Sequence, residues 1–370
     1  MRWLFSPVRF ALALLALASL TSVAPAAVHG GIEIGAKGVK AIVIDFTPTA
    51  DGYDLNVLFS DTTNTALASG ISATGKFDPK AVTATAEAVT KYATKMRDEF
   101  KIAPNRLYVV GSSGLFSAVE DKPDTVAANR DVLAKAVDEA AKVKMAFIDA
   151  RKEAELSVAG IVPKRFRSEA ALIDVGGGNT KGGAIGPDGK AILFAVPFGS
   201  LSFTEHVKKK GGTFPATARL ESDSTVIPAL RKQTAENGSL ADRNRFYVSG
   251  GAVWAITTLT HPGDRRPFTP LTLADIDSVA NKLAADPTTL PTIDFAAIKD
   301  PAERAYAESE YAKVKKSYAQ PEQLLAGTEV LRAAAAEYDL ARPGKTILFA
   351  RHGYVGWLLA YVAEAEIATK

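Results

Sequence analysis

The chain of 370 residues contains no cysteine, and its four histidines are scattered. The absence of cysteine excludes disulfides, thiol catalysis and cysteine metal sites, and the scattered histidines provide no set of zinc ligands. No charge of one sign dominates, because 44 basic and 41 acidic residues leave a net charge of +3 without a basic tail or block. The three tryptophans lack interleaved basic residues. We therefore expect no nucleic-acid partner.

The apolar segment near the N-terminus is too short to cross a bilayer, which requires about 20 residues. Arg2 and Arg9 precede the apolar stretch Phe10–Ala18, and small residues surround Ala24–Ala26. This pattern indicates a secretory signal peptide over residues 1–27, with an uncleaved anchor as the alternative. We therefore expect an exported, periplasmic protein with no stable membrane anchor after cleavage.

Two stretches share one sequence pattern, which predicts a strand, a glycine turn and a second strand. They are Ile32–Lys40 and Ile173–Lys181. In each, apolar residues lead up to one carboxylate, Glu33 or Asp174, and small residues follow before the chain becomes apolar again. Glycines allow successive backbone N–H groups to converge on an anion, and a nearby carboxylate can hold a hydrated metal. The repeat therefore predicts a pair of phosphate-binding turns.

The composition and the element pattern together predict the architecture. With 47% hydrophobic residues, the chain can bury a large core and is long enough for two domains. Strands and helices alternate in both halves, which predicts two α/β domains facing each other across a cleft, with a helical C-terminal region. We place the N-terminal domain at residues 28–165 and the C-terminal domain at 166–370. Residues 261–320, rich in proline and charge, read as an insertion or connecting arm.

Four features occur in a fixed order along the chain. They are the hairpin at Glu33, the turn Gly111–Gly114, the charged helix start around Glu153, and Leu172–Thr180 followed by Gly250 and Gly251. Together they resemble the exopolyphosphatase/guanosine pentaphosphate phosphohydrolase (Ppx/GppA) family of the actin-like superfamily. The resemblance covers roughly residues 31–260 and, more loosely, the chain from Pro321 onward. It implies two actin-like, ribonuclease H-like domains.

The resemblance also implies a reaction and the residues that perform it. A phosphohydrolase of this type cleaves terminal phosphoanhydride bonds of polyphosphate or a related phosphorylated ligand with a base-activated water. Glu153 matches the general base, whereas Glu33 and Asp174 match metal-linked carboxylates, with Mg²⁺ as the expected cofactor. The residues expected to bind phosphate are Gly35, Ala36, Lys37, Ser112, Ser113, Gly176, Gly177, Gly178, Asn179, Thr180, Lys181, Gly250 and Gly251.

Several positions depart from the family pattern. Glu33 stands where the first hairpin has aspartate, Lys181 replaces a glutamate, and Phe116 occupies the place of an arginine. A lysine near a metal position would repel the metal, yet it could itself neutralise a phosphate oxygen. The alternative is therefore a catalytically degenerate member that binds a polyanionic ligand or a protein partner without turnover. A homodimer is also left open.

Other interpretations of these residues remain. Glu153 lies in a run of charged residues and could be an exposed helix charge, and Ser112 and Ser113 could cap a helix. Arg351–Gly353 is similar to the opening motif of histidine phosphatases, but only 17 residues follow it. Kinase activity is disfavoured because an exported protein would lack a ready supply of nucleoside triphosphate.

Overall fold

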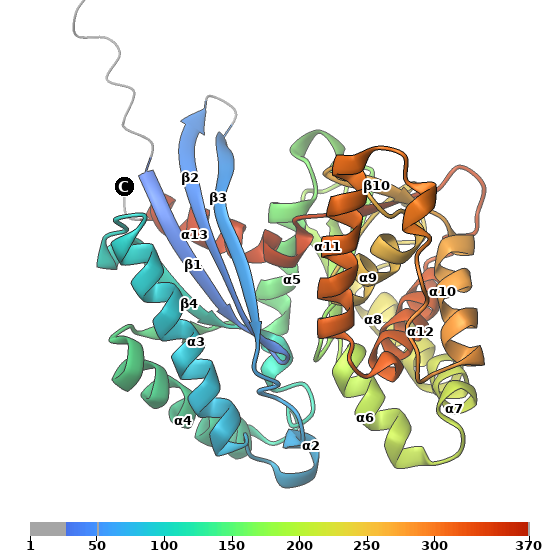
Figure 1. The fold of residues 1–370 in the computed structure, drawn as a ribbon, viewed down its shortest axis with the longest axis horizontal. Coiled ribbons are helices and arrows are strands. Elements are labelled where there is room, and N and C mark those ends of the chain that lie inside the picture. The colour runs from blue at the N-terminus through green and yellow to red at the C-terminus, as the bar shows by residue number, and fades with distance from the viewer. Residues whose placement is uncertain (1–26, 50–51, 369–370) are drawn as a thin grey trace, which may run out of the picture.

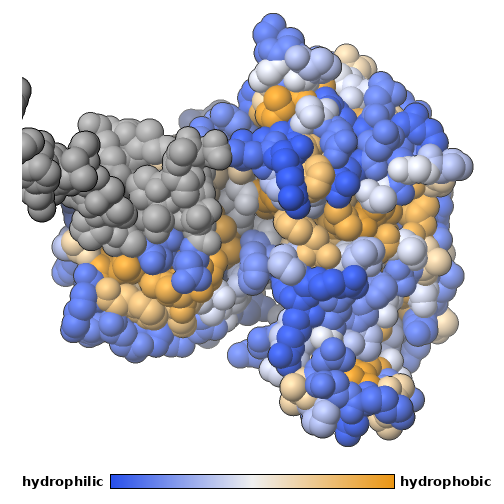
Figure 2. All heavy atoms as spheres, turned by 90° about the horizontal axis from the view of Figure 1, so that it is seen from above, coloured by the Kyte–Doolittle hydropathy of each residue, from blue (hydrophilic) through white to orange (hydrophobic). Residues whose placement is uncertain are grey.

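The chain folds into two lobes, each built on one β-sheet with helices packed against it (Figure 1). The computed structural model describes residues 27–49 and 52–368. Except for residue 27, the predicted signal peptide lies outside the described residues. Among the helices that are described, none has the length and apolarity to cross a bilayer. Seen from above, the lobes form two masses with a notch between them (Figure 2).

The first lobe contains a five-stranded sheet in the order β3-β2-β1-β4-β5. Strand β1 pairs antiparallel with β2 and parallel with β4. Its elements are β1 (Ala27–Ile34), β2 (Gly38–Thr49), β3 (Gly52–Asn64), α2 (Ile71–Thr74), α3 (Pro79–Asp98), β4 (Leu107–Gly111), α4 (Pro123–Ala141) and β5 (Met145–Phe147). Helix α3 begins where Asp78 caps the Lys80 N–H at 2.8 Å and Pro79 occupies the first turn.

The second lobe contains a six-stranded sheet in the order β10-β11-β9-β6-β7-β8. Its strands are β6 (Ala170–Val175), β7 (Thr180–Ile185), β8 (Ala191–Val196), β9 (Arg245–Ser249), β10 (Phe268–Leu271) and β11 (Thr346–Ala350). Its helices are α6 (Ser200–Lys210), α7 (Phe214–Glu221), α8 (Ile227–Asn237), α9 (Gly251–Thr260), α10 (Leu273–Ala285), α11 (Pro301–Ser317) and α12 (Pro321–Glu337). The expected alternation of strands and helices in both halves is thus confirmed.

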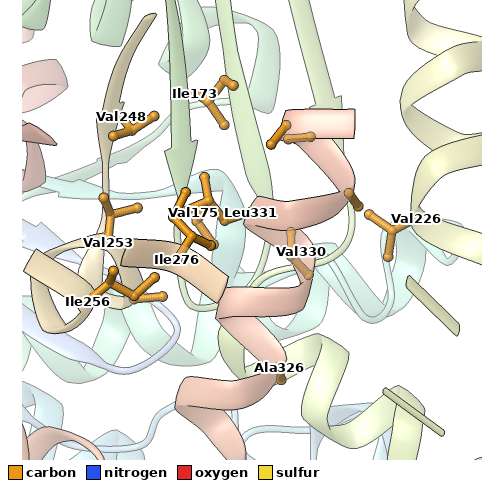
Figure 3. Close-up of a cluster of buried hydrophobic side chains, with 14 of the residues drawn as sticks. Ile173, Val175, Val226, Val248, Val253, Ile256, Ile276, Ala326, Val330 and Leu331 are labelled. Carbon is orange, nitrogen blue, oxygen red and sulfur yellow. The ribbon is translucent and has the colours of Figure 1, made fainter. Parts of the chain in front are cut away.

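Helix α12 forms the centre of the core in the second lobe. Figure 3 shows Val330 and Leu331 of this helix close to Val175 of β6, within one cluster of fully buried apolar side chains. Because burial of a leucine or valine side chain stabilises a fold by roughly 1.5–3 kcal/mol, this cluster makes the second sheet a rigid base for the hairpin β6–β7.

The last helix crosses back to the first lobe. Helix α13 (Gly356–Ala368) packs against β1 and against α5 (Ala150–Ile161), which itself packs on β6, β7 and β8 of the second sheet (Figure 1). A Cβ on Gly160 would lie 1.9 Å from the Gly356 carbonyl oxygen, so glycine permits the close approach of the two helices. The expected division put residues 166–370 in one domain, whereas α13 belongs with the first sheet.

Residues 261–320, expected to form an insertion or arm, are part of the second lobe. Strand β10 pairs antiparallel with β11 and extends the sheet, while α10 and α11 pack against α9. The proline and charge content of this segment therefore reflects loops and solvent-facing helix surface.

Candidate active site

The two repeated hairpins each carry a carboxylate and a lysine on neighbouring strands. Glu33 of β1 is the register partner of Lys40 on β2, and Asp174 of β6 is the partner of Lys181 on β7. Side chains that are directly opposite in an antiparallel pair share one face of the sheet and lie within contact distance. Each hairpin therefore contains a cross-strand ion pair.

Glu153 lies in the first turn of α5, between the two lobes. Asp149 caps the helix by accepting the Lys152 N–H at 2.7 Å, which fixes the start of the helix and hence the position of Glu153. Glu153 is 1% exposed, and its Oε2 accepts hydrogen bonds from the Ser113 N–H at 2.8 Å and the Ser113 hydroxyl at 2.6 Å. Glu153 is thus a buried carboxylate bonded to the end of β4, and it is not an exposed helix charge.

The Lys181 ammonium binds residues that in turn contact Ser113 of the first lobe. Its Nζ lies 2.9 Å from Glu153 Oε1 and 3.0 Å from Asp174 Oδ2, and it donates to Asn179 Oδ1 at 3.3 Å. The Asn179 amide nitrogen in turn donates to the Ser113 hydroxyl at 2.7 Å. Five residues that the sequence singled out therefore form one hydrogen-bonded network across the lobes.

The charges in this network stabilise one another. Burial opposes the charge of Asp174, but the Lys181 ammonium and the Ser249 hydroxyl, which donates to Asp174 Oδ1 at 2.6 Å, outweigh it and lower the pKa of Asp174 below its usual value. Burial also opposes the Lys181 ammonium, yet Glu153 and Asp174 raise the pKa of Lys181 above its usual value. Lys181 therefore stays charged at neutral pH. Gly250 and Gly251 follow Ser249 and begin α9.

Glu33 is held within its own lobe. Its Oε1 and Oε2 accept hydrogen bonds from Lys40 Nζ at 3.1 and 3.0 Å, and the Trp357 indole of α13 donates to Oε2 at 3.2 Å. Lys40 also donates to the Tyr354 carbonyl at 3.2 Å. Burial raises the pKa of Glu33 above its usual value, with Lys40 opposing the shift. This pair anchors the C-terminal segment to the first hairpin.

The glycine turn of the second hairpin is fixed from behind by α6. The Gly176 and Gly177 carbonyls accept hydrogen bonds from the Ser200 and Leu201 amides at 2.9 and 2.8 Å. A Cβ on Gly178 would lie 1.9 Å from the Gly114 carbonyl oxygen, so only glycine allows this turn to rest against the first lobe. The turn is therefore rigid and lies in direct contact with the opposite lobe.

The first turn closes on itself and then meets the second. Gly35 and Gly38 exchange backbone hydrogen bonds of 2.8 and 3.1 Å, and the Ala36 carbonyl accepts the Ala68 N–H at 3.0 Å. A Cβ on Gly177 would lie 3.0 Å from Lys37 Cγ, so the tips of the two predicted phosphate clamps touch.

Lys37 reaches past this contact into the second lobe. Its Nζ is buried without a hydrogen-bond partner and lies 4.0 Å from the centre of the Tyr318 ring. Burial lowers the pKa of Lys37 to about 7. A second contact bridges the lobes nearby, where Glu205 of α6 accepts from the Gly70 N–H at 3.2 Å and the Ser72 hydroxyl at 2.7 Å. The structure therefore describes a closed cleft.

Two predicted phosphate-binding residues are already engaged elsewhere. The Thr180 hydroxyl donates to the Phe198 carbonyl at 2.7 Å, and the Ser112 amide donates to the Ile34 carbonyl at 2.9 Å. Their contacts support the hairpin and the end of β4, and the network around Lys181 does not include their side chains.

Sequence reasoning overlooked Lys40, although a signal for it was present. A lysine stands seven positions after the carboxylate in both hairpins, Glu33 to Lys40 and Asp174 to Lys181. Since this spacing spans a tight turn in each, the repeat itself indicates two cross-strand pairs. The contribution of Trp357 carried no such signal, because it depends on α13 returning to the first lobe.

The predicted metal site was tested against the residues that surround it. Among the residues described, no three histidine, aspartate or glutamate side chains form a group that could hold a metal ion. Asp174 and Glu33 are each paired with a lysine ammonium at 3.0 Å. A divalent cation prefers oxygen ligands without a competing positive charge. The predicted role of Glu33 and Asp174 as Mg²⁺ ligands therefore does not fit.

Comparison with solved structures defines the class of fold. An exopolyphosphatase-like protein matches with a TM-score of 0.65 at 17% identity, covering 93% of this chain and all of that one. The Ppx/GppA family member of Aquifex aeolicus matches at 0.62 and 16%, covering 94% and 99%. An exopolyphosphatase of Cytophaga hutchinsonii matches at 0.61 and 15%, covering 91% and 98%. The fold is thus the two-domain, actin-like α/β architecture expected from the sequence.

The sequence comparisons point to the same group of proteins. A model described as the Ppx/GppA phosphatase family matches residues 46–225. Exopolyphosphatase 2 of Mycobacterium tuberculosis is 28% identical over 206 residues, which cover 54% of this chain and 62% of that protein. The match thus spans about three fifths of the length of this curated relative. Over residues 46–225 the chain is therefore similar to the Ppx/GppA phosphatase family.

Proposed function

We propose that the chain is a phosphohydrolase of the exopolyphosphatase type, which cleaves the terminal phosphoanhydride bond of polyphosphate or a related ligand bound between its lobes. The observation that carries this proposal is the position of Glu153. It comes from α5, bonds to Ser113 of the first lobe at 2.8 and 2.6 Å, and meets Lys181 of the second hairpin at 2.9 Å. A base at the junction of two phosphate-binding turns suits attack by water on a terminal phosphoryl group.

In this proposal each residue of the site has a separate role in the reaction. Glu153 orients the attacking water and takes its proton, while Lys181 and the turn of Gly176–Asn179 stabilise negative charge on the phosphoryl oxygens. Lys37 supplies a further positive charge once it is exposed to the ligand. Because the tips of the two hairpins touch, a ligand binds only after the lobes separate. The contacts of Lys37 and Glu205 across the lobes must then break.

A second candidate is binding of the same ligand class without turnover. Glu153 has both carboxylate oxygens engaged, Oε1 with Lys181 and Oε2 with Ser113. Neither oxygen can accept a proton from water without losing one of these contacts. This pairing favours a degenerate member that grips a polyanion in the cleft.

Phosphate release by the full chain separates the two candidates. A hydrolase releases phosphate from polyphosphate or a nucleoside triphosphate, and Glu153→Gln abolishes the release. Glu155→Gln, on the same helix but exposed to solvent, serves as the matched control and keeps the wild-type rate. A binding protein instead gains thermal stability from polyphosphate, releases no phosphate, and loses the gain in Lys37→Ala. Equal rates in Glu153→Gln and wild type remove Glu153 from the mechanism, and no thermal shift rejects both candidates.

We also propose that residues 1–27 direct export to the periplasm. Support comes from the arginines, short apolar stretch and small residues of this segment. Mass spectrometry of the protein recovered from the periplasm tests it, with a mature chain beginning near Ala27 or Val28 expected. Recovery of the intact chain from the cytoplasm alone rejects the proposal.

A further inference from the structure

Lys181 uses its full hydrogen-bonding capacity inside the cleft. An ammonium group has three donors, and Lys181 has three acceptors, Glu153, Asp174 and Asn179, at 2.9 to 3.3 Å. These acceptors come from α5, from β6 and from the turn between β6 and β7. The Lys181 side chain is 5% exposed. Such a completely enclosed cation acts as a fixed structural charge.

The Lys181 ammonium lies where a metal ion could balance the charges of the carboxylates. Two neighbouring buried carboxylates repel each other, and a cation between them removes that repulsion. The Lys181 ammonium lies 2.9 and 3.0 Å from the two carboxylates and already occupies one oxygen of each. A divalent ion that bound the same carboxylates would lie against the ammonium and be repelled by it.

The first hairpin also pairs its carboxylate with a lysine. Lys40 binds both oxygens of Glu33 at 3.1 and 3.0 Å, so the carboxylate of the other hairpin is also neutralised by a lysine. The cluster contains three carboxylates, Glu33, Glu153 and Asp174, and two ammonium groups. Each of these carboxylates is paired with one of the two ammonium groups.

We propose that Lys181 is a resident cation that takes the place of a divalent metal, so that the cleft of this protein works without a metal ion. A phosphorylated ligand then meets a lysine charge fixed by the fold. The proposal concerns the charge of the cleft, and it holds whether the bound ligand is hydrolysed or only retained.

Binding of Mn²⁺ to the full chain, followed by electron paramagnetic resonance, tests the proposal without an activity assay. We expect no Mn²⁺ site in wild type at millimolar ion, and a site at least tenfold tighter in Lys181→Gln. The control is Lys190→Gln, a lysine beside the next strand whose side chain is 86% exposed, and it behaves as wild type. Equal Mn²⁺ affinity in wild type and Lys181→Gln overturns the proposal.

A second arm covers the case in which Lys181→Gln fails to fold. Wild type and Asp174→Asn are titrated with Mn²⁺ under the same conditions, and we expect no binding in either protein. Binding to wild type that disappears in Asp174→Asn overturns the proposal, because it shows a metal on the carboxylate that Lys181 should occupy. Absence of phosphate release, by contrast, bears only on the proposed reaction.

Discussion

Each of the two hairpins pairs one carboxylate with one lysine, yet the two pairs have different roles. Glu33 and Lys40 bond to Trp357 and to the Tyr354 carbonyl, so the first pair fastens the C-terminal segment to its own lobe. Lys181 instead binds Glu153 of α5, which bonds to Ser113 of the first lobe. The same strand–turn–strand pattern thus anchors the C-terminal segment in the first hairpin and takes part in the contact between the lobes in the second.

The largest expected effect distinguishes these two roles directly. Lys181→Met leaves Asp174 and Glu153 buried without their counter-ion, and we expect it to lower the free energy of unfolding by about 3–5 kcal/mol. Lys40 is 30% exposed, and Glu33 keeps its Trp357 bond, so Lys40→Met should cost about 1–3 kcal/mol. Urea unfolding of both variants measures the difference. Equal losses would mean that the two pairs are equivalent.

Alanine in the two glycine turns compares how tightly each is enclosed. In Gly178→Ala the new Cβ would lie 1.9 Å from the backbone oxygen of Gly114, so the lobes must shift, at about 1–3 kcal/mol. In Gly35→Ala the nearest atom is Glu33 Oε1 at 3.0 Å, so a much smaller shift makes room for the Cβ. Thermal unfolding should show a clear loss only in Gly178→Ala. A larger loss in Gly35→Ala would reverse this ranking.

A substitution of Trp357 tests whether the Glu33–Lys40 pair anchors the C-terminal segment. Trp357→Phe keeps most of the packing of α13 but removes the donor to Glu33 Oε2, and we expect a loss of about 1–2 kcal/mol. Hydrogen exchange of α13 amides should become faster, while exchange at the second hairpin stays unchanged. Equal acceleration at both hairpins would show that the pairs are coupled.

The smallest effect concerns Lys37 and pH. The folded-state pKa of about 7 lies below the ordinary lysine value of 10.5, so between these pH values the unfolded chain binds one more proton than the folded chain. The stability of wild type relative to Lys37→Met should therefore rise with pH above 7, by about 1 kcal/mol between pH 7 and 8. Urea unfolding at these two pH values measures the change. A difference that stays constant or falls would place a charged Lys37 in the closed cleft.

The sequence predicted the strands and turns of the site well. The repeated hairpin and the helix start at Glu153 depend on local pattern, and both are present. Lys181 was identified as a departure from the family, but its bonds to Asp174 and Glu153 depend on how the lobes meet. Local periodicity contains no information on that arrangement.

The parts that sequence reasoning missed depend on contacts distant along the chain. The return of α13 to the first sheet joins Trp357 to Glu33, 324 positions apart. The contact of Lys37 with the second lobe likewise requires the closed arrangement. Helices α7, α8 and α10 were also not predicted individually, because their segments were assigned only to the second half and its arm.

The most direct test of a lysine-based phosphohydrolase is the rate of phosphate release from polyphosphate by wild type, measured first in EDTA and then in excess Mg²⁺. With Lys181 as the cation, we predict release in EDTA and the same rate after Mg²⁺ is added. Release that begins only when Mg²⁺ is present would contradict the account.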